Sequence, residues 1–258
     1  MNVMVFDIET IPDTDFGRRY LDLGDLPDED VARAMVAARR EQTGGSEFLA
    51  HHVHRVVAIS VVLRSQSQFK VWSLGDENAD EAELVRRFFD GIDRYRPTLV
   101  SWNGGGFDLP VLHYRAMLHG IDARRYWDTG DLDRDAKWNN YTNRFHWRHI
   151  DLMDVLSGFQ ARATAPLDQV ALLLGFPGKL GMSGSQVWPA YLEGKIGEIR
   201  DYCETDVLNT YLVYLAFEVN RGNIDGDGFA AECRALREYL AGEGKPHFDR
   251  FLGAWPAA

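Results

Sequence analysis

The sequence predicts an α/β domain with a mixed central sheet covered by helices. Short apolar, β-branched runs of strand length alternate with longer stretches in which apolar residues recur every three or four positions, as on one helix face. Two of the strand-like runs, 55–63 and 69–73, are separated by only a few polar residues and predict an antiparallel hairpin. The chain has 258 residues, of which 45% are hydrophobic, so it can bury a sizeable core.

The first strand is expected at residues 3–8, where an apolar, β-branched run continues until Pro12 ends it. Between residues 27 and 42 the pattern becomes helical, with acids first and arginines last, in agreement with the helix dipole. This segment is too short to hold a core of its own. We therefore expect a helical insertion at about 13–50, between the first two strands.

The later elements continue the alternation of strands and helices. A polar turn at 64–67 closes the hairpin, and residues 122–149 have no regular pattern. The remaining predictions are a helix over 84–92 that Pro97 stops, a strand at 98–102, a helix from about 108 to 120, a strand near Ile150, helices over 151–159, 166–174, 196–218 and 229–240, and a glycine-rich loop over 175–184. Together they predict a single domain over 1–258 with a helical extension at about 225–258.

Composition and charge exclude several classes of protein. No apolar stretch approaches the ~18 residues of a membrane span, and the first residues lack the features of a secretion signal, so we expect a cytoplasmic protein without a membrane partner. Cys203 and Cys233 are too few for a disulfide framework and are interpreted as reduced fillers. The net charge of −11 opposes binding to a polyanion, but bound divalent cations or locally gathered basic residues offset such a charge.

Asp7 and Glu9 are the first candidate site residues. They lie two positions apart on the first strand, so both carboxylates project to the same face of the sheet. Buried like charges need a cation or an arginine between them. The alternative is a solvated strand end.

A second polar cluster, NGGGFD at 103–108, follows the strand at 98–102. It lacks the third glycine of a dinucleotide-binding fingerprint, because that position is Leu109. The cluster predicts a glycine turn that permits close approach to a ligand and places Asp108 at a helix start. The alternative for Asp108 is a plain N-cap.

The late helix carries the third candidate group. Tyr202 and Asp206 are four residues apart and share one helix face, although Tyr202 alone is also explained by packing. With Asp7, Glu9 and Asp108, Asp206 completes a set of four carboxylates. Oxygen ligands without His or Cys favour Mg²⁺ or Mn²⁺ over zinc.

These segments, in this order, resemble a known enzyme family. FDIET, NGGGFD and YCETD are similar to the three exonuclease motifs of the DEDD superfamily of 3′-to-5′ exonucleases, which have an RNase H-like fold. Tyr202 at the first position of the third motif resembles the tyrosine branch. Over about residues 3–218 the chain resembles short, free-standing exonucleases related to the proofreading domain of family B DNA polymerases.

The resemblance implies two-metal hydrolysis of a phosphodiester bond, with two Mg²⁺ or Mn²⁺ ions about 3.5–4 Å apart. Asp7 then bridges both ions, Glu9 and Asp206 complete the ion that generates hydroxide, and Asp108 holds the second ion through water. Tyr202 orients the attacking water, since an unperturbed phenol stays protonated near neutral pH.

Substrate contacts are expected from two kinds of residue. The resemblance implies that Thr10 and Asn103 contact the terminal nucleotide and that Phe107 stacks on a base, with a core role as its alternative. Residues 136–150 contain Arg144 and Arg148 among aromatic residues and no acid, which predicts a nucleic-acid platform or, alternatively, a loop with aromatic packing.

Further candidates are less specific. Lys179 is a candidate phosphate contact in a flexible loop. His51, His52 and His54 lack partners at metal spacing and are interpreted as surface or structural residues.

The sequence therefore predicts a metal-dependent 3′-to-5′ exonuclease that acts on the free 3′ end of single-stranded nucleic acid. DNA is favoured and RNA is the alternative, since discrimination depends on how the pocket treats the 2′-hydroxyl. An inactive RNase H-like module that only binds strands or partners is the hypothesis from another class, and the intact set of acids argues against it.

Overall fold

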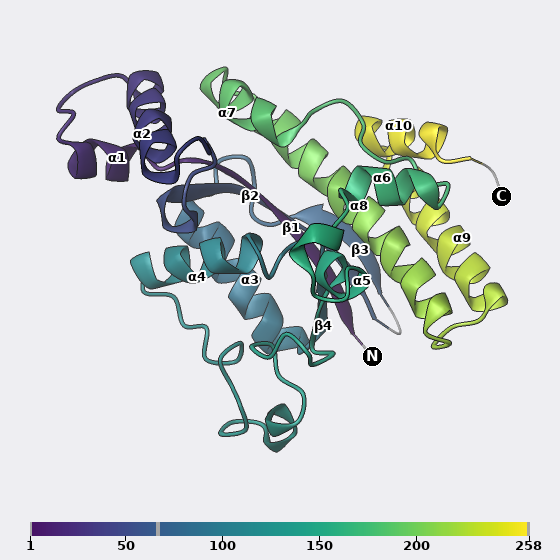
Figure 1. The fold of residues 1–258 in the computed structure, drawn as a ribbon. Helices are drawn as coiled ribbons and strands as arrows, with labels where there is room; N and C mark the ends of the chain where they lie inside the picture. Colours follow the sequence, from purple (N-terminus) through teal and green to yellow (C-terminus); the bar gives the residue numbers. More distant parts are fainter. Residues whose placement is uncertain (1, 66–67, 257–258) are drawn as a thin grey trace.

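The computed structural model describes residues 2–65 and 68–256 and contains one five-stranded sheet with the order β3-β2-β1-β4-β5 (Figure 1). The strands are β1 (Val3–Pro12), β2 (His54–Arg64), β3 (Phe69–Ser73), β4 (Thr98–Ser101) and β5 (His149–Asp151). β2 pairs antiparallel with both β1 and β3, whereas β1, β4 and β5 run parallel. The predicted mixed sheet and the hairpin are confirmed; residues 66 and 67 of the predicted turn lie outside the described residues.

Helices cover both faces of the sheet. α3 and α4 lie on one face, and the long helix α8 with α9 lies on the other (Figure 1). The α-helices are α1 (Thr14–Leu21), α2 (Asp28–Thr43), α3 (Glu81–Tyr95), α4 (Asp108–Leu118), α5 (Leu152–Leu156), α6 (Leu167–Leu173), α7 (Gly184–Leu192), α8 (Ile196–Asn220), α9 (Gly226–Glu243) and α10 (Pro246–Ala254), and the 3₁₀ turns are η1 (His51–Val53), η2 (Arg134–Lys137) and η3 (Ala161–Ala163).

The alternation of side chains along β1 separates two cores. Val3 and Val5 pack with α8 and α9, and Met4 and Phe6 pack with α3 and α4. Because side chains alternate along a strand, the next odd-numbered residues of β1 also face α8. This register decides where the acidic residues of the strand lie.

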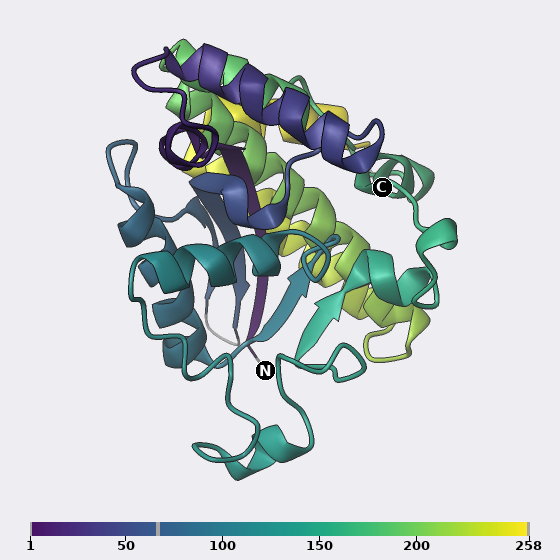
Figure 2. The ribbon, with the colours of Figure 1, turned by 60° about the vertical axis from the view of Figure 1, so that its left-hand side comes forward.

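The segment between β1 and β2 contains two helices where the sequence predicted one. α1 precedes α2, and Val31 and Met35 of α2 are buried in a small core with Leu49 and Val53. Figure 2 shows α2 crossing one end of the molecule, where it lies near α7. α1 is short and charged, so its sequence carries little helical periodicity.

Three other predictions of helix boundaries need correction. The helix expected over 151–159 ends at Leu156, and α7, which was not predicted, begins at Gly184, the last residue of the predicted glycine-rich loop. α10 within the extension was not recognised; its buried Phe248 and Phe251 pack into the α8–α9 core. Residues 257 and 258 of the predicted extension lie outside the described residues.

A buried ion-pair cluster fixes α4 relative to its neighbours. Nε of Arg115 on α4 donates to Oε1 of Glu81 on α3 at 2.7 Å, and its Nη1 donates to Oδ2 of Asp13 at 2.5 Å, at the end of β1. Glu81 Oε1 also accepts the backbone N–H of Val56 on β2 at 2.6 Å. One arginine therefore connects α3, α4, β1 and β2 directly or through Glu81. Within residues 2–65 and 68–256, no helix has the length and apolar character needed to cross a membrane.

Candidate active site

Asp7 and Glu9 lie on the face of β1 that packs against α8. Glu9 is buried, Asp7 is half-buried, and one oxygen of each carboxylate lies within 4.8 Å of the other and of the thiol sulfur of Cys203 on α8. The alternative interpretation, in which Asp7 and Glu9 lie at a solvated strand end, does not fit this burial. The two acids predicted to share a face therefore do so, beneath a helix.

Asp108 reaches the same position from α4. It is the first residue of that helix, and its Oδ1 accepts a hydrogen bond of 3.1 Å from the backbone N–H of Ile8, between the two acids of β1. β4 pairs with β1 only as far as Val5, so Asp108 supplies an acceptor beyond the end of that pairing. The alternative of a plain N-cap is wrong, because Phe107 occupies the N-cap position.

α8 brings Tyr202, Cys203 and Asp206 to the acids of β1. The Cys203 thiol donates to the backbone oxygen of Asp7 at 3.4 Å and lies 3.6 Å from its Oδ2. Burial, followed by the charges of Asp7 and Glu9, raises the pKa of this thiol, which keeps it protonated as a donor. Cys203 is therefore a site residue and not a filler, and a lone cysteine inside YCETD carries no spacing signal that could have identified it.

The acids of β1 repel their neighbours. Burial raises the pKa of Asp7 well above its usual range, and the charges of Asp108, Glu9 and Asp206 raise it further. Burial likewise raises the pKa of Glu9, with added repulsion from Asp206 and Asp108. At neutral pH this arrangement favours bound protons or bound cations.

Asp108 and Asp206 are perturbed in the same direction. Burial raises the pKa of Asp108 to about 7 against the opposing hydrogen bond from Ile8. Burial raises the pKa of Asp206 to about 6, although a hydrogen bond from the Tyr202 hydroxyl acts to lower it. The Cys203 thiol beside the acids stays protonated, so the ligands on offer are the oxygens of four carboxylates that repel one another, which fit a site for Mg²⁺ or Mn²⁺.

The glycine turn after β4 is held by a residue that the sequence analysis missed. Asp151, at the end of β5, accepts hydrogen bonds from the backbone N–H groups of Asn103 at 2.8 Å and Gly105 at 2.9 Å. Asn103 has a φ of 64°, in the left-handed region. At Gly104 a Cβ would come within 2.3 Å of the Ser101 hydroxyl, so the turn requires glycine there. Only the parallel pairing of β4 and β5 brings Asp151 to this turn.

Thr10 and Phe107 meet at a buried histidine. His54 lies with its ring 5.1 Å from that of Phe107, and its Nε2 is 3.2 Å from the backbone oxygen of Leu49. Since a carbonyl only accepts, Nε2 carries the proton. Burial lowers the pKa of His54 to about 4, so at neutral pH its Nδ1 accepts from the Thr10 hydroxyl at 2.9 Å. His54 is structural, as predicted, and it orients Thr10.

Lys179, which the sequence offered as a candidate phosphate contact, lies beside the acids. Its Nζ is 5.3 Å from the centroid of the Tyr202 ring, and its charge lowers the pKa of Asp206. The backbone around it is fixed: Asn209 of α8 exchanges two hydrogen bonds with Gly178, at 2.8 and 3.0 Å, and Asp168 accepts the Lys179 N–H at 2.6 Å. The loop that appeared flexible in the sequence is therefore anchored at this point.

Arg148 does not lie with the carboxylates. Arg148 directly precedes β5 and donates to the backbone oxygen of Arg96, just before β4, so it lies at the edge where the parallel strands begin. The acids lie toward the edge where these strands end. Arg144 forms an ion pair with Asp154 at 2.6 Å. Contact between these arginines and a bound strand stays a prediction.

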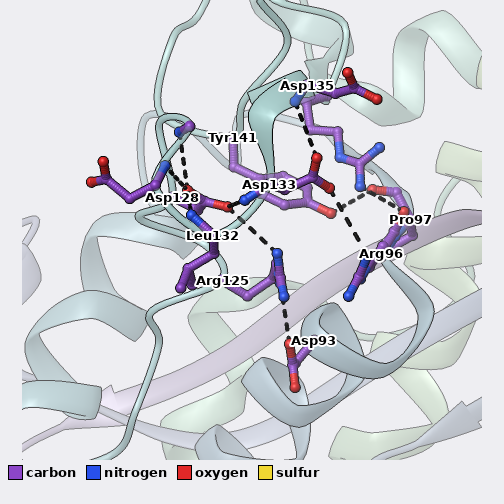
Figure 3. A network of polar contacts seen from close by, with 12 residues as sticks. Asp93, Arg96, Pro97, Arg125, Asp128, Leu132, Asp133, Asp135 and Tyr141 are labelled. Carbon is purple, nitrogen blue, oxygen red and sulfur yellow. Dashed lines mark hydrogen bonds and ion pairs between the residues drawn. The ribbon is translucent and has the colours of Figure 1, made fainter. Parts of the chain in front are cut away.

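The irregular region that contains these arginines is organised around Asp128 (Figure 3). Asp128 accepts four backbone N–H groups, from Gly130, Asp131, Leu132 and Asp133, at 2.8–3.0 Å. Tyr141 is buried and donates to the Pro97 oxygen at 2.7 Å, whereas Trp138 and Phe145 are exposed. Part of the aromatic segment thus packs under the loop, and part faces solvent.

Comparisons with known proteins identify relatives of the chain. A family model described as a predicted 3′-5′ exonuclease related to the exonuclease domain of PolB matches residues 46–255. The catalytic polypeptide of DNA polymerase epsilon from Saccharomyces cerevisiae is 27% identical over 151 residues, which are 57% of this chain and 6% of that protein. DNA polymerase 1 of Sulfurisphaera ohwakuensis is 51% identical over 37 residues, 14% of this chain and 4% of that protein.

A solved structure shares the fold. The family B DNA polymerase from Pyrobaculum calidifontis matches with a TM-score of 0.51 and 19% identity, over 85% of this chain and 24% of that chain. The RNase H-like fold is confirmed. The chain spans only a small part of the curated polymerases that it matches. On the family match, the chain belongs to the 3′-5′ exonucleases related to the exonuclease domain of PolB.

Proposed function

We propose that the protein is a metal-dependent 3′-to-5′ exonuclease that removes nucleotides from the 3′ end of single-stranded DNA. The observation that carries this proposal is the convergence of acids from three elements: Asp7 and Glu9 of β1, Asp108 of α4 and Asp206 of α8, all with raised pKa values. Such a cluster has no role in packing, because its charges oppose one another. DNA is preferred over RNA as substrate because the matched relatives are DNA polymerases.

Asp7, Glu9, Asp108 and Asp206 are the residues that would hold two divalent ions. Bound there, the ions supply Lewis acidity that activates water and offsets charge on the phosphate. The fold contributes the placement of the carboxylates. Asp108 is fixed by the Ile8 N–H and Asp7 by the Cys203 thiol, so two of the ligands are oriented before any ion binds.

Tyr202 acts as a donor rather than as a base. Burial and the charges of Asp206, Glu9 and Asp7 raise its pKa, so the hydroxyl keeps its proton throughout the neutral range. Its place is to orient the attacking water beside Asp206. Lys179, with its ammonium group near the Tyr202 ring, would contact a phosphate oxygen.

The nucleotide at the 3′ end would contact Thr10, Asn103 and Phe107. Because the Thr10 proton is donated to His54, the Thr10 oxygen is left as an acceptor, which suits the hydroxyl of a sugar. Asn103 presents its side chain from a turn that Asp151 holds rigid.

The test uses oligonucleotides labelled at the 5′ end, as single- and double-stranded DNA and RNA, with Mg²⁺, Mn²⁺ or EDTA. We expect a ladder of shortening labelled products from single-stranded DNA, dependent on metal and absent for Asp7→Asn. A labelled mononucleotide as first product would indicate the opposite polarity. Faster hydrolysis of RNA would reassign the substrate, and binding without hydrolysis under every condition would favour the inactive module.

A further inference from the structure

An exposed aromatic ring from the segment between β1 and β2 lies against the candidate active site. Phe48 is 58% exposed, and its ring centroid is 5.4 Å from that of Phe107, the residue before Asp108. An exposed phenylalanine is common on protein surfaces, but this one touches a residue of the site. Its position beside Phe107 suggests that it contacts the substrate.

The backbone of Phe48 is fixed on both sides. Nε of Arg39 on α2 donates to the Phe48 oxygen at 2.9 Å, and the Phe48 N–H donates to Oγ of Ser46 at 3.3 Å. The next residue, Leu49, is buried in the small core beneath α1 and α2. The ring is therefore presented to solvent from an ordered base, and it loses little conformational freedom when a ligand covers it.

The same segment crosses the turn that leads to Asp108. Nε2 of His51 lies 2.9 Å from the backbone oxygen of Gly106, and the centroid of its ring lies 5.8 Å from that of the Phe107 ring. His54 packs on Phe107 and bonds to Thr10. Phe48 and Phe107 thus form one aromatic surface, continuous with Thr10, that begins beside Asp108 and leads away from it.

We propose that Phe48 and Phe107 form a stacking surface for the bases at the 3′ end of the strand, and that Phe48 is a specificity-determining residue supplied by the inserted segment. This inference rests on the proposed function of the same site. Aromatic rings stack on any base, so the surface would favour strands with bases near the 3′ end without selecting their sequence. Binding affinity would depend little on the identity of each base and strongly on whether a base is present.

The experiment compares a 12-nucleotide single-stranded DNA with the same strand carrying abasic sites at its last two positions. Affinity is measured by fluorescence anisotropy with Ca²⁺ in place of Mg²⁺, and hydrolysis is measured separately with Mg²⁺. The variants are Phe48→Ala, Phe48→Trp and, as a control, Tyr20→Ala, which removes a ring that is 64% exposed on α1 of the same segment.

We expect Phe48→Ala to bind the normal strand about 5- to 150-fold more weakly, the range for loss of one stacking contact, and to bind the abasic strand as the wild type does. Phe48→Trp should keep the preference, and Tyr20→Ala should behave as the wild type. Equal losses on both strands, or no loss on either, would overturn the inference. The anisotropy measurement tests the stacking surface even if no hydrolysis is found. An absence of hydrolysis would instead contradict the proposed function.

Discussion

Replacing Asp7 with Asn should abolish hydrolysis and stabilise the metal-free protein. Asn keeps an oxygen that accepts from the Cys203 thiol but removes the charge that the other acids oppose. The carboxylate atoms of Asp7 and Glu9 lie within 4.8 Å. Coulomb's law at that separation gives about 1 kcal/mol in water and about 3.5 kcal/mol at an effective dielectric constant of about 20. Because Asp7 is half-buried, its repulsion with Glu9 lies between these limits. Where both acids are ionised in the wild type, we expect Asp7→Asn to raise the free energy of unfolding by about 2 kcal/mol.

The gain should depend on pH. Raised pKa values mean that the folded, metal-free protein binds protons more tightly than the unfolded chain, so the stability they contribute is present below about pH 4 and declines as pH rises. The pKa values of Asp206 and Asp108, about 6 and about 7, place much of the decline between pH 5 and 8. Asp7→Asn should therefore melt about 4–8 °C above the wild type at pH 8.5 in EDTA and near it at pH 5.

Thermal unfolding with EDTA or Mg²⁺ measures both effects, with Asp90→Asn on the exposed surface of α3 as the control for the same change of charge. Mg²⁺ at 100 times its dissociation constant should stabilise the wild type by about 2.7 kcal/mol, and it should stabilise Asp7→Asn far less. The reasoning is refuted if Asp7→Asn gains no more than Asp90→Asn at pH 8.5, or if Mg²⁺ stabilises it as much as the wild type.

Three further predictions concern other parts of the site. Tyr202→Phe should lower single-turnover rates, with little change in affinity and a smaller loss than Asp7→Asn; wild-type rates would remove the hydroxyl from catalysis. Asp151→Asn should raise KM and loosen the turn it holds, visible as faster amide hydrogen exchange at residues 103–105; unchanged exchange would contradict this role. Arg144→Ala combined with Arg148→Ala should weaken binding of long strands and flatten its salt dependence, with turnover of short oligonucleotides unchanged; a loss on short substrates would place these arginines nearer the acids.

The sequence predicted that the four acids lie close together, because local geometry is enough to group them. Asp7 and Glu9 share a face through the two-residue period of a strand, and Tyr202 and Asp206 through the helical turn. Asp108 follows β4, which runs parallel to β1, so both strands end toward the same edge of the sheet. Each step needs only periodicity and strand order.

The residues that hold those acids were missed because they act across long separations in the chain. Asp151 bonds to Asn103 and Gly105 across a strand pairing, and Cys203 bonds to Asp7 across the packing of α8 on β1. The short helices α1, α7 and α10 escaped prediction for a related reason. A helix of two or three turns is marginal alone and forms where tertiary packing supports it, as Phe248 and Phe251 support α10.

The position of these supporting residues explains how the fold tolerates a cluster of like charges. The acids are carried by β1, α4 and α8, and each of these elements also contributes to a hydrophobic core: α8 to one face of the sheet, α4 to the other, and β1 to both. Arg115 further ties α4 to the end of β1. The packing energy of whole elements therefore opposes the separation of the carboxylates, together with the hydrogen bonds from Ile8 and Cys203 within the site. Cations that bind between them relieve a repulsion that the fold maintains, so metal affinity and metal-free instability have the same physical origin.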